Sequence, residues 1–461
     1  MSSHQHSLPE AFLQSLDGLP GFDRAAFCEI HALSQTVTSI RLNPAKKAAA
    51  HTYGFRESGP VPWAGYGRYL QERPSFTLDP LFHAGAYYVQ EASSMFLEQV
   101  MSQTVDLNQP LQVLDLCAAP GGKSTHLQSL LSADSLLVSN EVIKTRSGIL
   151  QENLTKWGGI NGIVTQNDPA DFKKLPGFFD VIVVDAPCSG SGMFRKDVDA
   201  INEWSVDHVT LCSQRQKRIL ADILPALKEG GILIYYTCSY SKNENEEVVD
   251  WLMDSHHLKS LSITTASFDG IVVSPSEQLG GWGYRFYPNW LQGEGFFIAA
   301  FQKHLSSAET GKKYNTTKLD KFASKHVPAI QSWIQSEQSL SFFQQNEEVV
   351  VLPSSIQSFV EIIKSSLYIK KAGMSMGAMV RDTFIPSHGW AMSSIQSNII
   401  PSFSLEVEQA RQYLRHQQFD YPDGLKGWYL VKYAEVPLGL VKCMPGRLNN
   451  YYPRDWRILN K

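Results

Sequence analysis

Short apolar runs alternate with longer amphipathic stretches between residues 111 and 301. The apolar runs have strand length and predict strands at 111–116, 135–139, 163–165, 181–184 and 232–237. Helical periodicity fills the gaps and predicts helices over 123–131, 144–157 and 203–228. One more helix is expected over 244–253, followed by a closing strand over 296–301. This alternation predicts an α/β fold with a doubly wound, mostly parallel Rossmann-like sheet.

The pattern changes on both sides of this region and predicts further units. Residues 1–105 are rich in aromatic and turn-forming side chains and predict an N-terminal α+β extension, which leaves 106–303 as the sheet domain. Residues 304–321 lack apolar periodicity and carry Ser, Thr, Lys and Gly, as expected of a linker. Beyond it we expect a small α+β domain over 322–395 and a C-terminal domain over 396–461.

Two cysteines close neighbouring apolar runs of the expected sheet. Cys188 follows the run that ends at Asp185, and Cys238 follows the run over 232–237. Ligands of open α/β sheets bind beyond the carboxyl ends of the strands, so both thiols are expected at one site. Buried, inert cysteine is the alternative, since free cysteine is often buried. The polar neighbours Asp185, Ser189 and Ser239 favour covalent chemistry.

Composition narrows the class of protein. The chain has 461 residues, 43% of them hydrophobic and 19% charged, which is ordinary for a globular protein. No apolar stretch reaches the roughly 20 residues that span a bilayer, and the polar N-terminus has no signal-peptide core. Six cysteines without a Cys-x-x-Cys pair indicate a reducing, cytoplasmic compartment and no metal site. Net charge is −4, but residues 361–461 carry thirteen Lys and Arg against eight Asp and Glu, which fits a polyanion-binding appendage.

The first strand of the sheet leads into a glycine loop. A P-loop needs glycine where this chain has Cys117, and the spacing of G-x-G-x-x-G is also absent. The remaining interpretation is a small-residue turn that brings a nucleoside cofactor to backbone N–H groups at a helix N-terminus. The candidate cofactor-binding residues of this loop are Cys117, Ala118, Ala119, Pro120, Gly121, Gly122 and Lys123.

Acidic residues follow the next two strands. Glu141 is placed to accept both hydroxyl groups of a ribose, and Asp168 is placed to accept from an adenine amino group. Each acid alone is more simply a solvated loop residue. Their joint placement after a glycine turn favours S-adenosylmethionine as the cofactor. Arg146 and Asp185 complete the candidate cofactor-binding set.

Several segments together resemble one known family. They are Tyr88–Met95, Asp115–Ser124, Asp185–Gly192, Tyr236–Glu246 and Gly293–Ala299. On these segments the chain resembles the NOL1/NOP2/Sun family of RNA cytosine-C5 methyltransferases. The tail, with Pro437–Lys442 and Gly446–Pro453, is similar to the PUA-like RNA-binding end of a bacterial subgroup that methylates 16S rRNA.

The resemblance implies roles for the catalytic candidates. Cytosine C5 becomes nucleophilic only after a thiolate adds to C6, and an acid near N3 stabilises the charge that builds up on the ring. In DNA cytosine-C5 enzymes the Pro-Cys thiol attacks, which would nominate Cys188, but the residues after it differ here. The RNA family instead implies Cys238 as nucleophile, Cys188 as an aid to product release and Asp185 as the ring acid. Lys123 is expected near the ring or the nucleophile, with a solvated lysine as the alternative.

The expected partner is 16S rRNA, either free or within the small ribosomal subunit, with no membrane or metal and a monomeric protein. RNA contacts near the site are implied for Arg41, Asn43, Tyr88, Gln90, Arg195 and Lys196. The tail offers basic and aromatic side chains in alternation, namely Lys432, Tyr433, Lys442, Arg447, Tyr451, Tyr452, Arg454, Trp456 and Arg457. Alternatives are a tRNA cytosine-C5 methyltransferase, a DNA methyltransferase and a non-catalytic RNA-binding assembly factor.

Overall fold

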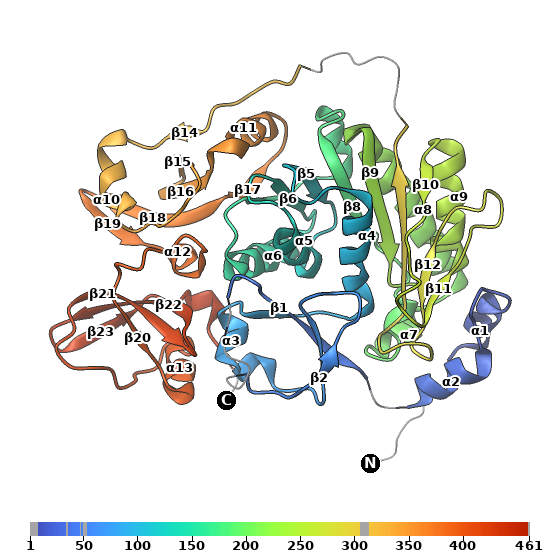
Figure 1. Ribbon diagram of the computed structural model, residues 1–461, viewed down its shortest axis with the longest axis horizontal. Coiled ribbons are helices and arrows are strands. Elements are labelled where there is room, and N and C mark those ends of the chain that lie inside the picture. The colour runs from blue at the N-terminus through green and yellow to red at the C-terminus, as the bar shows by residue number, and fades with distance from the viewer. Residues whose placement is uncertain (1–7, 34–35, 47, 49–52, 305–312, 460–461) are drawn as a thin grey trace.

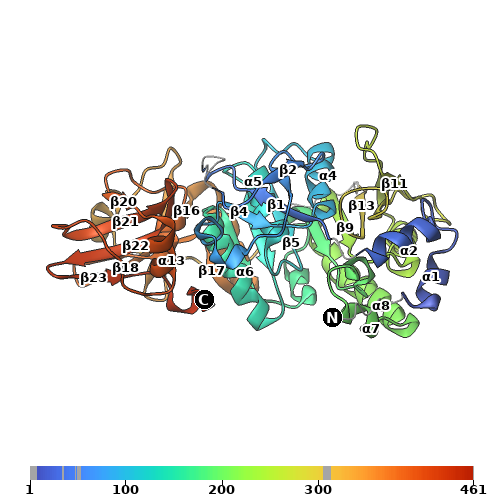
Figure 2. The same cartoon turned by 90° about the horizontal axis from the view of Figure 1, so that it is seen from below.

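A computed structural model describes residues 8–33, 36–46, 48, 53–304 and 313–459. The polar residues 1–7 and the central part of the expected linker, 305–312, lie outside the described residues. Within the described chain the strands form four sheets (Figure 1). Seen from below, the C-terminal sheet and the helices of the N-terminus lie at opposite ends of the molecule (Figure 2).

The N-terminal region holds four α-helices and a small antiparallel sheet in the order β2-β3-β1-β4 among its described residues. Its elements are α1 (Glu10–Leu16), α2 (Arg24–Ala32), β1 (Thr38–Leu42), β2 (Glu57–Pro60), β3 (Gly67–Leu70), α3 (Pro80–His83), β4 (Tyr87–Val89) and α4 (Leu97–Thr104). The side chain of Asp23 caps α2, and that of Asp79 caps α3, each by accepting a free N–H of the first turn. This small sheet leads directly into the central sheet.

The central sheet has ten strands, and its middle is parallel in the order β9-β8-β5-β6-β7. These strands are β5 (Gln112–Asp115), β6 (Leu136–Asn140), β7 (Gly162–Thr165), β8 (Phe179–Asp185) and β9 (Leu227–Thr237). Antiparallel strands extend both edges: β10 (Lys259–Leu261), β11 (Ile271–Val273), β12 (Tyr284–Phe286), β13 (Phe296–Gln302) and β17 (Ile369–Ala372). The predicted doubly wound core is therefore present, inside a mixed sheet that is wider than the predicted one.

Helices cover both faces of the central sheet because its side chains alternate. Leu114 and Ile182 point to the face that packs α8 (Val206–Ile223), α9 (Glu246–Ser255) and α11 (Gln357–Ser366). Val113 and Val183 point to the other face, against α4 and α5 (Gly122–Leu130), and α6 (Lys144–Trp157) packs beside α5. Both faces are buried, so the strands read as continuous apolar runs.

Two expectations about this region change. The helix expected over 203–228 is shorter and corresponds to α8, with a separate short helix α7 (Asp199–Glu203) before it, and β9 begins at Leu227 rather than at Ile232. Gly230, with φ of +73°, lets the strand continue through a bulge that local apolarity does not reveal. The segment 322–395, expected as a separate domain, contributes β17 to the central sheet by pairing with β7.

The remainder of the chain forms two further sheets. The first holds β14 (Asp320–Lys321), β15 (Leu340–Gln345), β16 (Glu348–Pro353), β18 (Met374–Val380) and β19 (Thr383–Pro386), with α10 (Val327–Gln331) and α12 (His388–Met392) beside it. The second holds β20 (Ser402–Ser404), β21 (Gly427–Tyr433), β22 (Val436–Met444) and β23 (Arg447–Asn450), with α13 (Val407–Leu414).

The last sheet shares a hydrophobic core with the first. Ile40 and Leu81 from the N-terminal region pack in one cluster with Tyr413, Val431 and Leu438 from the C-terminal sheet, and all five are fully buried. The Arg411 side chain also donates from Nε to the carbonyl oxygen of Leu78, at 3.0 Å. The N-terminal sheet and the C-terminal sheet are thus held against each other, whereas α1 and α2 pack elsewhere.

Candidate active site

The register of β8 and β9 brings the two cysteines together. Asp185 lies opposite Tyr236 in this parallel pair, so the residues just beyond it share one edge of the sheet. The Sγ atoms of Cys188 and Cys238 lie 3.2 Å apart, and both are free thiols with partly exposed side chains. Contact with Cys238 and burial together raise the pKa of Cys188 well above the usual value for a thiol. Cys188 is therefore a neutral thiol at neutral pH, able to donate to the neighbouring sulfur.

Asp185 and Lys123 form an ion pair beside these thiols. Lys123 lies in the first turn of α5, and its ammonium donates to Oδ2 of Asp185. Its Nζ also lies 4.9 Å from the centre of the Tyr236 ring. Burial opposes the charge on Lys123, but the attraction of Asp185 outweighs it and raises the pKa of Lys123. The edge therefore carries a fixed positive charge next to the sulfur pair.

The glycine loop lies between β5 and α5 at the same edge. Gly121 caps the helix with φ of +115°, a conformation that favours glycine. At the start of the loop, the buried Asp115 accepts from Ser124 Oγ at 2.6 Å, and burial raises the pKa of Asp115 to about 7. Oδ1 of Asp115 has no hydrogen-bond partner among the described residues. An unpartnered carboxylate oxygen at this place is suited to a ligand that donates or carries positive charge.

Side chains from α6 hold the loop in place. Arg146 donates to the carbonyl oxygen of Ala119 at 2.7 Å, and Asn153 donates to that of Pro120 at 2.8 Å. The N–H of Ala118 donates to the carbonyl oxygen of Asn140 at 2.8 Å. Arg146, a predicted cofactor-binding residue, is thus a brace of the loop in this structure.

The two predicted nucleoside acids lie at the ends of adjacent strands. Glu141 follows β6, is buried, accepts the N–H of Ile143 at 2.9 Å and lies 3.6 Å from the Arg146 guanidinium. Asp168 lies beyond β7, is exposed, and accepts the N–H of Ala170 at 3.0 Å. Since β6 and β7 pair in parallel, both acids face the edge that carries the glycine loop. Cys117 lies in that loop, where burial and nearby carboxylates, chiefly Asp185, raise the pKa of its thiol.

The donor set of this edge fits a cationic nucleoside cofactor. Backbone N–H groups at the start of α5 and the carboxylates of Asp115, Glu141 and Asp168 surround the loop, and such a group of acids disfavours a polyphosphate. Over the described residues, no group of three or more His, Cys, Asp or Glu is arranged to hold a metal ion. In the same part of the chain, no helix is both long and apolar enough to cross a bilayer.

Several expected RNA contacts are buried braces instead. Arg41 is almost fully buried, and it donates to Gln90 Oε1 at 2.9 Å, Thr125 Oγ1 at 2.6 Å and the carbonyl oxygen of Gly122 at 3.1 Å. It therefore ties β1 to the start of α5 and is closed to RNA. The sequence interpretation failed here because arginine is usually exposed, and its partners come from distant segments.

Some of the other expected RNA contacts are also buried, and others remain accessible. Asn43 is buried and donates to the carbonyl oxygens of Gly85 and Trp157, and the Arg195 side chain is buried against Glu294 at 3.3 Å. Tyr88 remains partly exposed next to the glycine loop, where a Cβ added to Gly122 would lie 3.1 Å from its ring. Gln90 is buried, whereas Lys196 is exposed and lies 3.9 Å from Glu294, so Tyr88 and Lys196 are the accessible members of the expected set.

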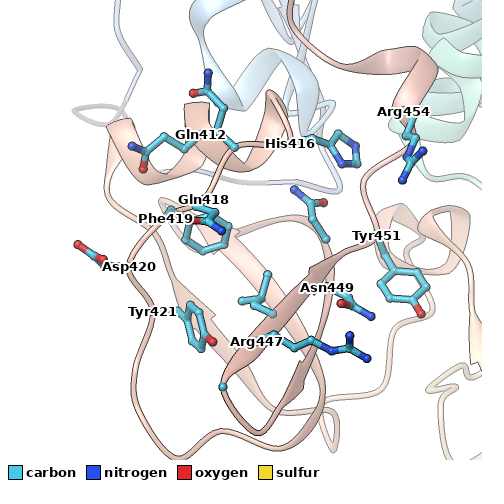
Figure 3. A pocket seen from close by; sticks show the side chains of 14 residues that line it. Gln412, His416, Gln418, Phe419, Asp420, Tyr421, Arg447, Asn449, Tyr451 and Arg454 are labelled. Atoms are coloured by element: carbon cyan, nitrogen blue, oxygen red, sulfur yellow. The ribbon is translucent and has the colours of Figure 1, made fainter.

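A polar groove of about 830 Å³ lies on the C-terminal sheet, away from the cysteines (Figure 3). Side chains from the end of α13, the loop after it and β23 line this groove. They include Gln412, His416, Tyr421, Arg447, Asn449, Tyr451 and Arg454. Among the aromatic residues expected to contact RNA, Tyr452 is instead buried in the shared core.

Comparisons with known proteins indicate similarity to one family. A family model described as 16S rRNA methyltransferase RsmB/F matches residues 102–302. The N-terminal domain of 16S rRNA methyltransferase RsmF matches residues 8–92, and the Methyltransferase RsmF PUA domain matches residues 401–458. Along most of its length the chain is therefore similar to 16S rRNA methyltransferases of the RsmB/F type, with the N-terminal and PUA domains of RsmF. Curated relatives named ribosomal RNA small subunit methyltransferase F include one from Salmonella agona, 29% identical over 99% of this chain and 98% of that protein. The relative from Aeromonas hydrophila is also 29% identical, over 90% of each chain.

Solved structures agree with the fold of this family. A methyltransferase homologue from Pyrococcus horikoshii is 29% identical, with a TM-score of 0.51, over 64% of this chain and 100% of that one. NSun6 from Pyrococcus horikoshii, solved with SFG, has a TM-score of 0.53 over 65% of this chain and 99% of that one. At 19% identity, NSun6 supports the fold alone.

Sequence reasoning assigned no role to two buried acids of the site. Asp115 and Glu244 lie within the segments that carried the family resemblance, yet neither follows a strand in the way that Glu141 does. Asp115 gave a signal, since it is an acid among apolar and small residues, where a carboxylate needs several donors. Glu244 gave none, because its neighbours in the sequence are polar and charged. The donors to Glu244 come from residues as far away as Ser189, so local pattern could not identify them.

Proposed function

We propose that the protein uses S-adenosylmethionine to methylate C5 of a specific cytosine in 16S rRNA. The observation that carries this proposal is the pair of free thiols 3.2 Å apart, beyond adjacent strands and beside the Asp185–Lys123 ion pair. A hydrolase that uses a cysteine nucleophile needs only one thiol together with a base. Two adjacent thiols suit a reaction in which a covalent bond to the substrate is made and then broken.

In the proposed reaction Cys238 attacks first. Its thiolate forms a bond to C6 of the cytosine, and the electrons move onto the ring so that C5 becomes an enamine carbon. The positive charge of Lys123 offsets the negative charge that builds up on the ring. Oδ1 of Asp185 has no bond from the described residues, which leaves it available to accept from the amino group of the base, and from N3 once the charge on the ring has drawn a proton onto that nitrogen. S-Adenosylmethionine, when bound, supplies the electrophilic methyl group.

Cys188 acts after the methyl group has been transferred. A proton must leave C5, and the electrons of that C–H bond then expel the Cys238 thiolate from C6. The neutral Cys188 thiol lies next to the Cys238 sulfur and gives it a proton as the C6–S bond breaks. The Cys188 thiolate that results is a strong base and takes the proton from C5, so both cysteines end as thiols. This position supports the assignment of Cys188 to product release.

The C-terminal groove supports an RNA substrate. Arg447 and Arg454 are exposed, and Tyr421 and Tyr451 offer aromatic faces in the same groove (Figure 3). Because the C-terminal sheet shares its core with the N-terminal region, deletion of residues 396–461 would uncover apolar surface. Substitutions at the groove therefore test RNA binding better than truncation does.

Trapping of the covalent intermediate tests the proposal. Purified protein is incubated with 16S rRNA and cofactor, and the products are separated on a denaturing gel. We expect Cys238→Ala to form no adduct and no 5-methylcytosine, and Cys188→Ala to accumulate a stable protein–RNA adduct. The reverse pattern would exchange the two roles, and adduct formation by both variants would exclude this mechanism.

Bisulfite sequencing identifies the substrate. RNA from cells that lack the protein is compared with RNA from cells complemented with the unmodified chain or with Cys238→Ala. We expect one 16S rRNA cytosine to lose its methyl group and to regain it only with the unmodified chain. Loss at a tRNA position instead would make the protein a tRNA methyltransferase, and no change at any cytosine would favour a non-catalytic assembly factor.

A further inference from the structure

A single buried carboxylate lies beneath both cysteine loops. Glu244, at the end of the 3-10 turn Lys242–Glu244, is fully buried and accepts four hydrogen bonds. Its Oε1 accepts the backbone N–H of Ser189 at 2.7 Å and Nε2 of Gln216 at 3.3 Å. Its Oε2 accepts the hydroxyl groups of Ser189 and Ser239, each at 2.6 Å. Both oxygens are therefore fully used.

No cation of the described residues offsets this charge. Glu244 takes part in no ion pair with them, and burial raises the pKa of its carboxyl group. Removing a charge from water without a partner is costly, so the four donors must supply the compensation. A carboxylate only accepts, which forces both serine hydroxyls to point their hydrogens at Glu244. In the hydrogen-bond network around Glu244, the donors and acceptors are therefore fixed.

The two serines are the residues that follow the two cysteines. Ser189 comes directly after Cys188, and Ser239 comes directly after Cys238. Their hydroxyl oxygens lie 3.3 Å apart over Glu244, as the two sulfur atoms lie 3.2 Å apart above them. One side chain therefore sets the spacing between two loops that are fifty residues apart in the sequence.

We propose that Glu244 is a positioning residue for both thiols, holding Cys238 where it attacks and Cys188 where it assists release. This inference rests on the proposed function, because it needs the two cysteines to act in successive steps. Misplacement of a reacting group by about 1 Å can cost roughly a hundredfold in rate. Loss of the shared anchor is thus expected to slow adduct formation and adduct breakdown together, by about tenfold or more in each step.

Glu244→Gln preserves the shape and removes the charge. If the new amide nitrogen replaces Oε1, it faces the Ser189 N–H, donor against donor. If it replaces Oε2, both serine hydroxyls must turn away and lose their acceptor. The matched control is Asp250→Asn on α9. Asp250 is also buried and accepts the N–H groups of Gln278 and Leu279 at 3.1 and 2.9 Å, away from the cysteine loops.

Single-turnover kinetics with 16S rRNA give the rates of adduct formation and of adduct breakdown for each variant. We expect Glu244→Gln to slow both rates while its melting temperature matches that of Asp250→Asn. Slow breakdown cannot come from unfolding, because an unfolded chain forms no adduct. If Glu244→Gln matches the unmodified protein in both rates, the inference is wrong.

Two serine variants each remove one of the hydroxyl groups that bond Glu244, and they test the inference even if Glu244→Gln does not fold. Ser239→Ala is expected to slow mainly adduct formation, since it frees the Cys238 loop. Ser189→Ala is expected to slow mainly breakdown, since it frees the Cys188 loop. Equal effects of the two variants on the same step would contradict the inference. Absence of any adduct or methylation with the unmodified protein would instead refute the proposed function on which it rests.

Discussion

Replacement of Asp115 by asparagine should stabilise the protein and change how its stability depends on pH. Burial raises the pKa of Asp115 to about 7 in the folded protein, and the charges of Asp185 and Glu141 act in the same direction. In the unfolded chain this carboxyl group titrates near its ordinary value of about 4. Between pH 4 and pH 7 the unfolded chain gives up this proton while the folded protein retains it. Below pH 4 the ionisation of Asp115 does not reduce the free energy of unfolding, and this free energy then falls as the pH rises to 7.

The magnitude follows from the two pKa values. The proton affinities of Asp115 in the folded and unfolded chain differ by about a thousandfold, and each factor of ten corresponds to about 1.4 kcal/mol. The loss of stability caused by ionisation of Asp115 therefore has an upper limit of about 4 kcal/mol. The amide that replaces the carboxyl group carries no charge, and its oxygen can still accept from Ser124. Asp115→Asn should thus equal the natural chain in stability near pH 4 and exceed it by up to about 4 kcal/mol at pH 8.

Urea unfolding from pH 4 to pH 8 measures this difference. Asp168→Asn is the control, because it removes an exposed carboxylate from the same edge and keeps a good helix cap. Its curve should run parallel to that of the natural chain. A difference for Asp115→Asn that is constant with pH, or a loss of stability at pH 8, would refute the reasoning. We also expect weaker binding of S-adenosylmethionine by this variant, measured by calorimetry, because the edge loses a carboxylate.

Three further outcomes are expected. Oxidised glutathione should join Cys188 and Cys238 by thiol–disulfide exchange, with loss of methylation that dithiothreitol restores; non-reducing mass spectrometry checks the bond, and persistence of two free thiols would contradict it. The double variant Arg447→Ala, Arg454→Ala should weaken RNA binding. In filter binding, the slope of log affinity against log salt should become shallower by about 0.7 for each phosphate that the protein no longer neutralises. An unchanged slope would contradict this prediction. Trp390→Ala should cost about 3–5 kcal/mol in urea unfolding, because Trp390 is fully buried; a decrease below about 1 kcal/mol would count against this.

The sequence predicted the parts of the fold that local pattern determines. Strands β5 to β8 and helix α6 lie close to their expected ranges, because fully buried parallel strands are continuous apolar runs. The edge strand β17 could not be predicted in this way. It pairs with β7 across about two hundred residues, and nothing in the residues 369–372 names that partner. Long-range pairing at a sheet edge leaves little trace in local sequence.

The site shows the same division. Cys188, Cys238 and the glycine loop were predicted to share one edge of the sheet because each follows an apolar run at a strand end, and the structure places them at that edge. Arg41 was expected at the surface, and its burial depends on acceptors from β4 and α5 that only the folded chain assembles. Side chains whose role is set by partners from other segments are the ones that sequence reasoning misses.

The hydrophobic core that the N-terminal sheet shares with the C-terminal sheet affects the order of folding. During synthesis the N-terminal sheet emerges first, but the apolar face that contains Ile40 and Leu81 is covered only when Tyr413 and Val431 have been made. The late closure of this face makes the newly made chain dependent on protection from aggregation until its last segments arrive. It also means that a chain interrupted before residue 405 would lack both the polar groove of the C-terminal sheet and the cover of its first sheet, so incomplete chains are exposed to removal by quality-control proteases.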